Sequence, residues 1–270
     1  MQIVVVDNAS TVRIADDWRA GHPNIRFVDN PENRCYAEGC NQAVDVSDGE
    51  LILLLNPDTR VGAGALDKMV DATRGGTRMV SARLVWPDGR TQASVRGFPT
   101  PGAVLAEMLG LARCCAVFDR WRLRRFPYDR EGVAPQPMAS CWMIPRAVWD
   151  SVGPMDPRFP LYFNDVDWAW RAHQAGWETW HVPDAVVVHD HGGTTKRVRK
   201  AALWESRRAF LRYWNKHHRS DRWLWLARWL VIVEAWARTG RWGHSLAGET
   251  TPESLQADFS VRERGTAKGR

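Results

Sequence analysis

Residues 51–62 read LILLLNPDTRVG, and this stretch decides the fold class. Five consecutive large aliphatic residues are too few to span a membrane and are typical of a strand covered on both faces. The run stops at Asn56, Pro57 and Asp58, so an acidic side chain follows the strand directly. In open α/β sheets ligands bind beyond the carboxyl ends of the strands. A plain turn is the alternative, because proline and aspartate both favour turn geometry.

Strand and helix patterns alternate on both sides of this stretch. Apolar runs that begin at Gln2 and Ile25 predict two strands, and a helix is expected over residues 36–46. Residues 62–74 have Leu66, Met69 and Val70 on one face, which favours another helix. Such alternation predicts βαβ crossovers and therefore an α/β fold with a mostly parallel central sheet flanked by helices.

The second half of the chain adds a hairpin, a loop region and more helices. We expect a hairpin over residues 79–95, and a loop with a short helix above the site over residues 98–137. A strand and a helix that ends at Gly153 follow, and then a helix from about Asp165 to Ala175. Short strands should end at His189. The composition is helical from Lys200 to Arg241, and residues 245–270 have the polar composition of a disordered tail.

Charge is distributed unevenly along the 270 residues. The net charge is +6, but residues 196–244 contain 13 Lys and Arg against 3 Asp and Glu, which is 13 − 3 = +10. The remainder is therefore 6 − 10 = −4. A basic segment beside a neutral-to-acidic body points to an anionic partner such as a membrane, a nucleic acid or a phosphorylated substrate. Five cysteines without a CxxC pair or a secretory signal favour reduced thiols, a cytoplasmic location and no structural zinc site.

Acidic and histidine side chains stand at the predicted strand ends. Asp58 could bind Mg²⁺ or Mn²⁺, which proteins hold with one or two carboxylates and the phosphate oxygens of a substrate. His189 and His191 project to the same side of an extended segment, and an imidazole beside a carboxylate suits Mn²⁺. Each histidine could equally be an ordinary surface or core residue.

The segment Asn164-Asp165-Val166-Asp167 begins a predicted helix. Asn164 can cap the helix, and the two aspartates suit its first turn for electrostatic reasons alone. The same position would also hold Asp165 rigid and ionised, ready to accept a proton from a hydroxyl. The local pattern does not choose between these two interpretations.

Taken in order, these motifs resemble the family 2 glycosyltransferases with the GT-A fold, in particular the rhamnosyltransferase-like branch, over roughly residues 2–218. VVVDNAST is similar to the second strand of that family, and NRCYAEGCN is similar to its Asn-x-Gly-Phe-Ala-x-Gly-x-Asn segment. The resemblance implies a nucleotide site that contains Asp7, Asn8, Asn33 and Asn41. Tyr36 and Cys35 replace the usual Phe and Gly of this segment.

The remaining motifs contain the residues that the resemblance assigns to metal binding and to the general base. LLLNPDT resembles the Asp-x-Asp motif, with Asn56 in place of the first acid and Asp58 on the metal side. LYFNDVDWAWRAHQAGW resembles the segment that supplies the general base, which makes Asp165 the catalytic residue. VVVHDHGGTT resembles the closing histidine segment, with His189 and then His191 as metal ligands. Residues around the acceptor or supporting the base would be Asn164, which stands where the family has Glu, Asp167 and Arg171.

The family also has one further strand and helix before the equivalent of Gln2, so we expect the first strand and helix of the fold to be missing from residues 1–198. These residues form the expected catalytic domain, followed by a basic amphipathic helical extension over residues 199–244 and the tail over residues 245–270. Arg228 and Glu234 interrupt the apolar run of the extension, which suits a helix lying in the headgroup region of a membrane. Packing on the catalytic domain is the competing view. No nucleic-acid binding is expected, because no recognised module accompanies the charge.

The resemblance implies an inverting glycosyltransferase that uses Mg²⁺ or Mn²⁺. Its donor would be a nucleoside diphosphate sugar, with dTDP-L-rhamnose favoured, and its acceptor a cell-envelope glycan or a polyprenyl-linked sugar. The protein would work in the cytoplasm, with peripheral contact at the inner face of the cell membrane. Two rivals stay open: a nucleotidyltransferase with the same metal site, and a truncated, non-catalytic homologue that binds a membrane or a partner.

Overall fold

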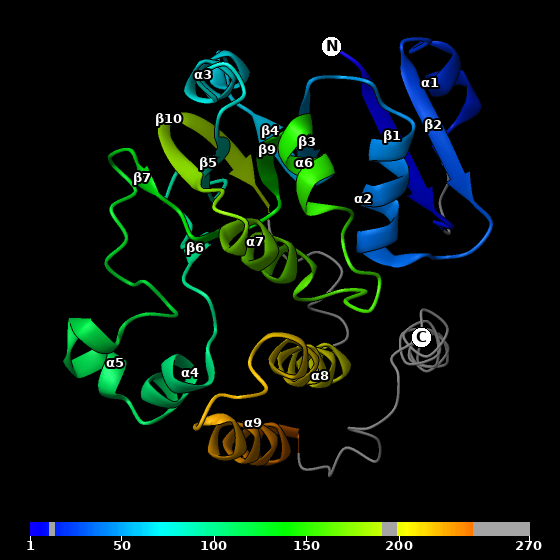
Figure 1. The fold of residues 1–270 in the computed structure, drawn as a ribbon. Coiled ribbons are helices and arrows are strands. Elements are labelled where there is room, and N and C mark those ends of the chain that lie inside the picture. The colour runs from blue at the N-terminus through cyan, green and yellow to red at the C-terminus, as the bar shows by residue number, and fades with distance from the viewer. Residues whose placement is uncertain (11–13, 191–198, 240–270) are drawn as a thin grey trace.

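A six-stranded mixed sheet forms the centre of the molecule in the computed structural model, which describes residues 1–10, 14–190 and 199–239 (Figure 1). Its strand order is β3-β9-β5-β10-β4, and β7 pairs with β10 as well. The strand bounds are Leu51–Leu55 for β3, Thr59–Val61 for β4, Met79–Val85 for β5, Gly132–Val133 for β7, Cys141–Pro145 for β9 and Thr179–His189 for β10.

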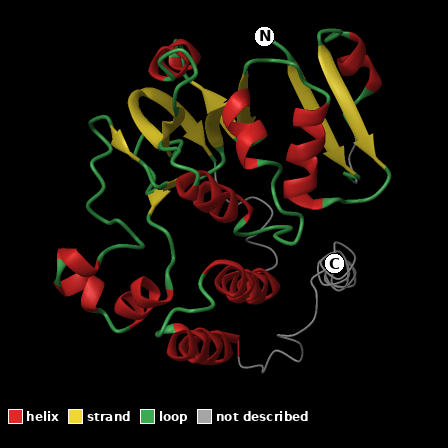
Figure 2. Ribbon diagram, viewed as in Figure 1, coloured by secondary structure: helices red, strands yellow, loops and turns green. Residues whose placement is uncertain are grey.

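The sheet is less parallel than the sequence predicts. Among the described strands that pair directly in this sheet, β5 and β10 are parallel, whereas β9 is antiparallel to both β3 and β5, and β10 is antiparallel to β4 and β7. The difference has two causes. The long segment before β9 lets this strand enter the sheet in the opposite direction, and the tight turn at Asp58 reverses the chain into β4. The α/β fold class, with a central sheet flanked by helices, is confirmed (Figure 2).

The first two strands form a separate sheet. β1 (Ile3–Asn8) and β2 (Ile25–Asn30) pair in parallel, and the polar residues at their ends are in register, with Asp7 opposite Asp29 and Asn8 opposite Asn30. Helices α1 (Asp16–Ala20) and α2 (Cys35–Asp45) accompany this pair. A third pair, β6 (Val95–Arg96) and β8 (Gln136–Pro137), is only two residues long.

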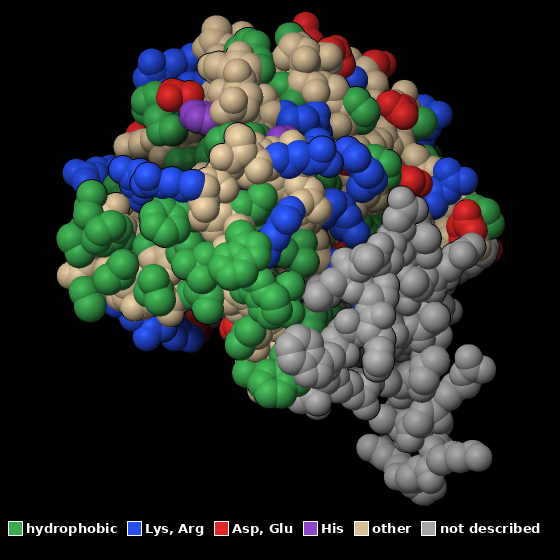
Figure 3. Space-filling view, turned by 60° about the horizontal axis from the view of Figure 1, so that its bottom comes forward, with side chains coloured by type: hydrophobic (Ala, Val, Ile, Leu, Met, Phe, Trp, Pro, Cys, Tyr) green, Lys and Arg blue, Asp and Glu red, His purple; other side chains and the backbone are tan. Residues whose placement is uncertain are grey.

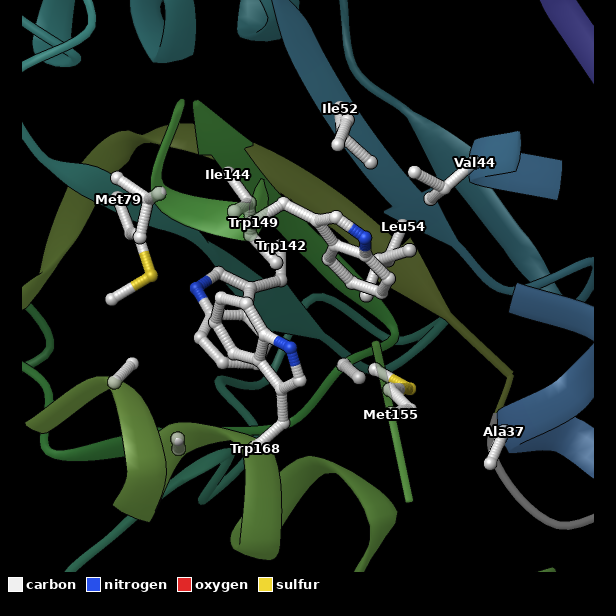
Figure 4. Close-up of a cluster of buried hydrophobic side chains, with 14 residues drawn as sticks. Ala37, Val44, Ile52, Leu54, Met79, Trp142, Ile144, Trp149, Met155 and Trp168 are labelled. Atoms are coloured by element: carbon white, nitrogen blue, oxygen red, sulfur yellow. The ribbon is translucent and has the colours of Figure 1, made fainter. Parts of the chain in front are cut away.

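Alternate side chains of the main sheet enter two different hydrophobic clusters. On one face Trp142 of β9 packs with Trp149 of α6 (Arg146–Val152) and Trp168 of α7 (Asn164–Gln174) (Figure 4). On the other face Met143 of β9 packs with Met69 of α3 (Ala65–Ala72). Because neighbouring residues of one strand face opposite sides, helices cover both faces of the sheet.

The last two helices share a third cluster with the body of the protein. Helices α8 (Arg199–His217) and α9 (Leu224–Thr239) pack with α4 (Pro101–Met108), and their buried side chains include Phe210, Trp214 and Val231. The short elements α5 (Leu111–Cys114) and η1 (Ala116–Phe118) follow α4 (Figure 1). The view that the C-terminal helices pack on the catalytic domain is therefore correct for one face of α9. The predicted tail over residues 245–270 lies outside the described residues.

Most predicted elements are present with small shifts of their ends. Helix α7 begins at Asn164, so the residue that precedes it and caps it is Phe163 and not Asn164. The predicted short strands before His189 are one long strand, β10, with an irregularity between Val182 and Val186. No helix among the residues that the structure describes has both the length and the apolar character needed to cross a membrane.

We expect a Gly62→Ala substitution to destabilise the protein. Gly62 donates its N–H to the Val186 carbonyl oxygen (3.1 Å), and a Cβ atom at Gly62 would lie 2.7 Å from that oxygen. Moving β4 away from β10 to relieve this clash should lower the free energy of unfolding by about 1–3 kcal/mol. Urea denaturation measures the change. Gly132→Ala is the control, because a Cβ there meets open space, and equal stabilities of the two variants would contradict the prediction.

Candidate active site

The antiparallel pairing of β4 with β10 brings two of the three predicted metal ligands together. In this register Thr59 lies opposite His189, and the N–H of Asp190 donates to the carbonyl oxygen of Asp58 (2.9 Å). As a result, Nε2 of His189 lies 3.4 Å from Oδ1 of Asp58. The His189 side chain is 1% exposed and that of Asp58 is 40% exposed, so the pair reaches from the core to the surface.

Gln92 orients the imidazole ring of His189. The Gln92 side-chain amide donates from Nε2 to the backbone carbonyl oxygen of His189 (2.6 Å), which leaves its oxygen Oε1 at 2.9 Å from Nδ1 of the ring. Because this oxygen can only accept, Nδ1 must carry the ring proton. The lone pair of the neutral imidazole is then on Nε2, the atom nearest to Asp58. This is the arrangement that metal-binding histidines commonly have.

A divalent cation fits this pair of side chains. One carboxylate and one imidazole nitrogen supply two ligands, and phosphate oxygens of a substrate can complete the coordination. Among the described residues no group of three or more His, Cys, Asp and Glu side chains could hold a metal ion. The other predicted ligand, His191, lies outside the described residues.

Asp165 is held in place at the start of α7. Its Oδ1 accepts the N–H of Val166 (2.8 Å), and Nε2 of Gln136 lies 3.3 Å from Oδ2. Burial raises the pKa of Asp165 above the ordinary aspartate value, although hydrogen bonds from the backbone of Val166 and Ala139 act in the opposite direction. A carboxylate with a raised pKa binds a proton more readily, which suits a general base.

The turn at residues 139–140 connects Asp165 to the metal-ligand pair. Ala139 bonds to the Asp165 carboxylate, and the hydroxyl of Tyr36 donates to the Ala139 carbonyl oxygen (3.3 Å). The neighbouring Ser140 is bonded twice to Asn56, two residues before Asp58.

The side chain of Tyr36 bonds to the same turn through its hydroxyl. Burial raises the pKa of Tyr36 most, the neighbouring Cys40 raises it next, and the negative charges of Asp165 and Asp58 make the smallest contributions. The hydrogen bonds of residues 139 and 140 to Asp165 and to Asn56 are what bring both carboxylates to the same edge of the main sheet.

Asp167 faces away from Asp165 and attaches α7 to α8. Its side chain is fully buried and contacts Nε2 of His217 (2.7 Å), Nζ of Lys216 (2.7 Å) and Nε of Arg171 (3.0 Å). Burial alone would raise the pKa of Asp167, but hydrogen bonds from His217 and Lys216 outweigh it and hold the pKa below the ordinary value.

Arg171 and Asn164 also bond to the protein's own backbone. Arg171 donates to the carbonyl oxygens of Val152 and Pro154 (2.7 Å each), and the Oδ1 atom of Asn164 accepts the N–H of Asp165 (2.7 Å). In this structure both residues support the helix that carries Asp165. Contact of these residues with an acceptor stays a prediction.

The four residues predicted to bind the nucleotide are also engaged within the protein. Oδ1 of Asp7 accepts the N–H of Ser10 (2.8 Å), and Asn33 accepts the N–H of Cys35 (2.8 Å). These contacts leave further acceptor sites on both side chains. Their role in binding a nucleotide stays a prediction.

Asn8 and Asn41 use both ends of their amides. Asn8 accepts from Asn30 (2.8 Å) and donates to the Cys35 carbonyl oxygen (3.0 Å), while Asn41 exchanges two hydrogen bonds with the backbone of Met155 (2.8 and 2.9 Å). Asn41 thus ties α2 to the segment before α7. These contacts show structural roles that the sequence pattern does not reveal.

A surface hollow of about 440 Å³ lies elsewhere and takes no part in this site. Its lining includes Arg78 before β5 and Glu178 before β10, so it sits at the amino-terminal ends of these strands. The candidate site lies at the opposite, carboxyl-terminal ends, where ligands of α/β sheets bind.

Comparison with known proteins agrees with the motifs in the sequence. Residues 1–128 match the model of "Glycosyl transferase family 2". The N-acetylglucosaminyl-diphospho-decaprenol L-rhamnosyltransferase of Mycobacterium tuberculosis is 26% identical over 216 residues, which cover 73% of this chain and 69% of the relative. The low-salt glycan biosynthesis hexosyltransferase Agl10 of Haloferax volcanii is 26% identical over 180 residues, covering 64% of this chain and 53% of that protein.

Solved structures share the fold at low sequence identity. GalNAc-T7, solved with UDP, GalNAc and Mn²⁺, superposes with a TM-score of 0.58 at 12% identity over 97% of this chain, which spans 48% of the GalNAc-T7 chain. The mannosyltransferase PcManGT from Pyrobaculum calidifontis, solved with GDP-Man and Mn²⁺, superposes with a TM-score of 0.51 at 18% identity, covering 100% of this chain and 67% of that chain.

The family match includes Asp7, Asn33, Asn41 and Asp58, whereas Asp165 and His189 lie beyond its last residue. The relatives and the shared fold agree with this match. The protein is thus a glycosyltransferase with the GT-A fold, and its residues 1–128 are similar to glycosyl transferase family 2.

Proposed function

We propose that this protein transfers a sugar, with inversion, from a nucleoside diphosphate donor to a hydroxyl group of a lipid-linked or cell-envelope glycan. The observation that carries the proposal is the contact between Asp58 and His189, joined through residues 139–140 to Asp165. In this proposal the site for the diphosphate and the base for the hydroxyl lie at the same edge of one sheet.

Asp165 is the proposed general base. It takes the proton of the acceptor hydroxyl while that oxygen forms a bond to the anomeric carbon of the donor sugar. The bond from this carbon to the diphosphate breaks on the opposite face, and the nucleoside diphosphate leaves with the bonding electrons. Contacts with Val166 and Ala139 keep the carboxylate oriented for the proton transfer.

Asp58 and His189 are the proposed ligands of Mg²⁺ or Mn²⁺. When bound, the cation supplies positive charge that stabilises the departing diphosphate. Gln92 keeps the His189 ring in the tautomer that can bind the cation. The Mn²⁺ in the solved structures of GalNAc-T7 and PcManGT supports a divalent ion in this fold.

dTDP-L-rhamnose is the proposed donor and a polyprenyl diphosphate sugar the proposed acceptor. The name of the Mycobacterium tuberculosis relative supports both, because it describes rhamnosyl transfer to a decaprenol-linked sugar. Incubation with dTDP-L-rhamnose, Mn²⁺ and such an acceptor tests the proposal directly. Release of dTDP is expected, whereas release of pyrophosphate would indicate nucleotidyl transfer and overturn it.

We predict that Asp165→Asn and Asp58→Ala separate transfer from donor binding. Asp165→Asn should bind dTDP and Mn²⁺ with unchanged affinity in calorimetry, yet lose at least about 100-fold in kcat. Asp58→Ala should weaken Mn²⁺-dependent binding of dTDP. Normal turnover by Asp165→Asn would show that another group is the base.

The raised pKa of Asp165 predicts how activity depends on pH. The ionised carboxylate is the active form, so kcat should fall as the pH drops through this pKa, which lies above the ordinary aspartate value of about 4. Folding binds this proton more tightly, so the ionised group costs stability at neutral pH. Asp165→Asn, which resembles the neutral acid, should therefore melt at an equal or higher temperature than the wild type at pH 7. A lower melting temperature would contradict this assignment.

Gln92→Leu should weaken the metal site without removing either ligand. Loss of the ring contact lets the His189 ring change its tautomer, and losses of such supporting contacts commonly reduce metal affinity about 10–100-fold. Titration with Mn²⁺ in the presence of dTDP measures the effect. Gln136→Leu is a matched control on a buried glutamine that contacts Asp165 and not His189, and its Mn²⁺ affinity should stay at the wild-type value.

A further inference from the structure

Helix α9 has two apolar faces, and one of them packs against the rest of the described residues. Leu224, Ala227, Val231 and Ala235 are buried against the body of the molecule. Trp225 is 70% exposed and Trp229 is 49% exposed, and their rings lie 6.4 Å apart. At about 100° of rotation per residue these tryptophans point away from the buried side. Leu226 and Val233 extend the exposed apolar face.

A second exposed apolar segment lies at Leu109–Phe118, far from α9 in the sequence. Leu109 is 63% exposed and Val117 is 59% exposed, and Leu111 and Phe118 are exposed as well. Helix α4 joins the two regions, because it packs on α9 and leads directly into α5 and η1. Hydrophobic side chains gather over both regions in one view of the surface (Figure 3). We call this combined surface, formed by Leu109–Phe118 and the exposed side of α9, the apolar face.

Positive charge borders the apolar face. Residues 109–125 contain five arginines, at positions 113, 120, 122, 124 and 125, and one acid, Asp119. Asp119 and Glu107 pair with Arg124, and Glu107 also lies 4.0 Å from Arg122. The exposed residues Arg113, Arg120 and Arg125 keep this segment positive. Arg222 is exposed beside Trp223 at the start of α9. Lysine and arginine side chains flank the hydrophobic area in Figure 3.

The exposed tryptophans, the other exposed apolar residues and the nearby arginines suit contact with an anionic lipid surface. Single exposed hydrophobic residues are ordinary, but a joined apolar area marks an interaction site. Tryptophan rings favour the boundary between lipid headgroups and acyl chains, and nearby arginines are attracted to anionic headgroups. Protein interfaces are also enriched in tryptophan and arginine, so a contact between two copies of the chain is one outcome of the test below.

We propose that the apolar face binds the surface of a membrane that contains anionic phospholipid, with α9 lying in the plane of the headgroups and Leu109–Phe118 inserting beside it. This inference deepens the proposed function, because it rests on a lipid-linked acceptor as the reason to bind a membrane. Helix α9 thereby packs on the protein with one side and on lipid with the other. Packing on the body of the protein is observed for this helix, and its contact with lipid is the proposal.

Vesicle flotation of the full chain, without donor or metal, tests the proposal. The protein should float with vesicles of equal parts phosphatidylglycerol and phosphatidylcholine, and less with pure phosphatidylcholine. The Trp225→Ser/Trp229→Ser variant and the Val117→Ser/Phe118→Ser variant should each lower the apparent affinity at least about tenfold. Trp18→Ser is the control, since Trp18 is 44% exposed on α1, outside the apolar face, and it should bind like the wild type.

Each other outcome contradicts the proposal in its own way. If the folded wild type does not float with the vesicles, the protein does not bind this membrane and the proposal is wrong. If only one double variant weakens binding, the two regions do not act as one surface. Light scattering identifies the remaining case: a dimer that the tryptophan variant dissociates, without vesicle binding, would make the apolar face a contact between two copies. Thermal melting shows that the variants are folded. Transfer to a water-soluble acceptor, measured separately, tests the proposed function independently of lipid binding.

Discussion

The short antiparallel pair of β4 with β10 is the constraint on which the site depends. Asp58 lies in the turn before β4 and His189 ends β10, so each could face solvent alone if the strands were not paired. The register that places Thr59 opposite His189 brings the carboxylate and the imidazole within 3.4 Å. Gly62 permits the close approach of the strands, and Gln92 sets the ring proton. The chemistry at this edge of the sheet thus follows from backbone pairing.

Helix α7 connects this edge to the C-terminal helices. Asp165 and Asp167 are two residues apart on one helix and therefore point to different sides of it. Asp165 contacts Gln136, near the site, while Asp167 holds Lys216 and His217 of α8. The helices after β10 are consequently part of what positions the candidate base. Helix α9 also contributes its exposed side to the apolar face.

Local patterns in the sequence identify the strands, the helices and the polar residues at strand ends. Apolar runs such as residues 51–55 and the glycine after α6 carry that information directly. The direction of β9 and the presence of β4 cannot be predicted in this way. Strand β4 has only three residues, too few to show a hydrophobic period. The direction of β9 is set by its pairing with β3 and β5, which lie far away in the sequence. Gln92 and Ser140 have no local signature either. Asn41 matches a motif, yet its amide serves the backbone of Met155.

The proposed transfer requires that Asp58, His189 and the diphosphate of the donor share one site. Anomalous X-ray diffraction from crystals grown with Mn²⁺ and dTDP measures this most directly. We predict a manganese peak within bonding distance, about 2.0–2.3 Å, of a carboxylate oxygen of Asp58 and of Nε2 of His189, with dTDP phosphate oxygens on its open side. A manganese ion bound to the diphosphate but remote from both side chains would contradict the account.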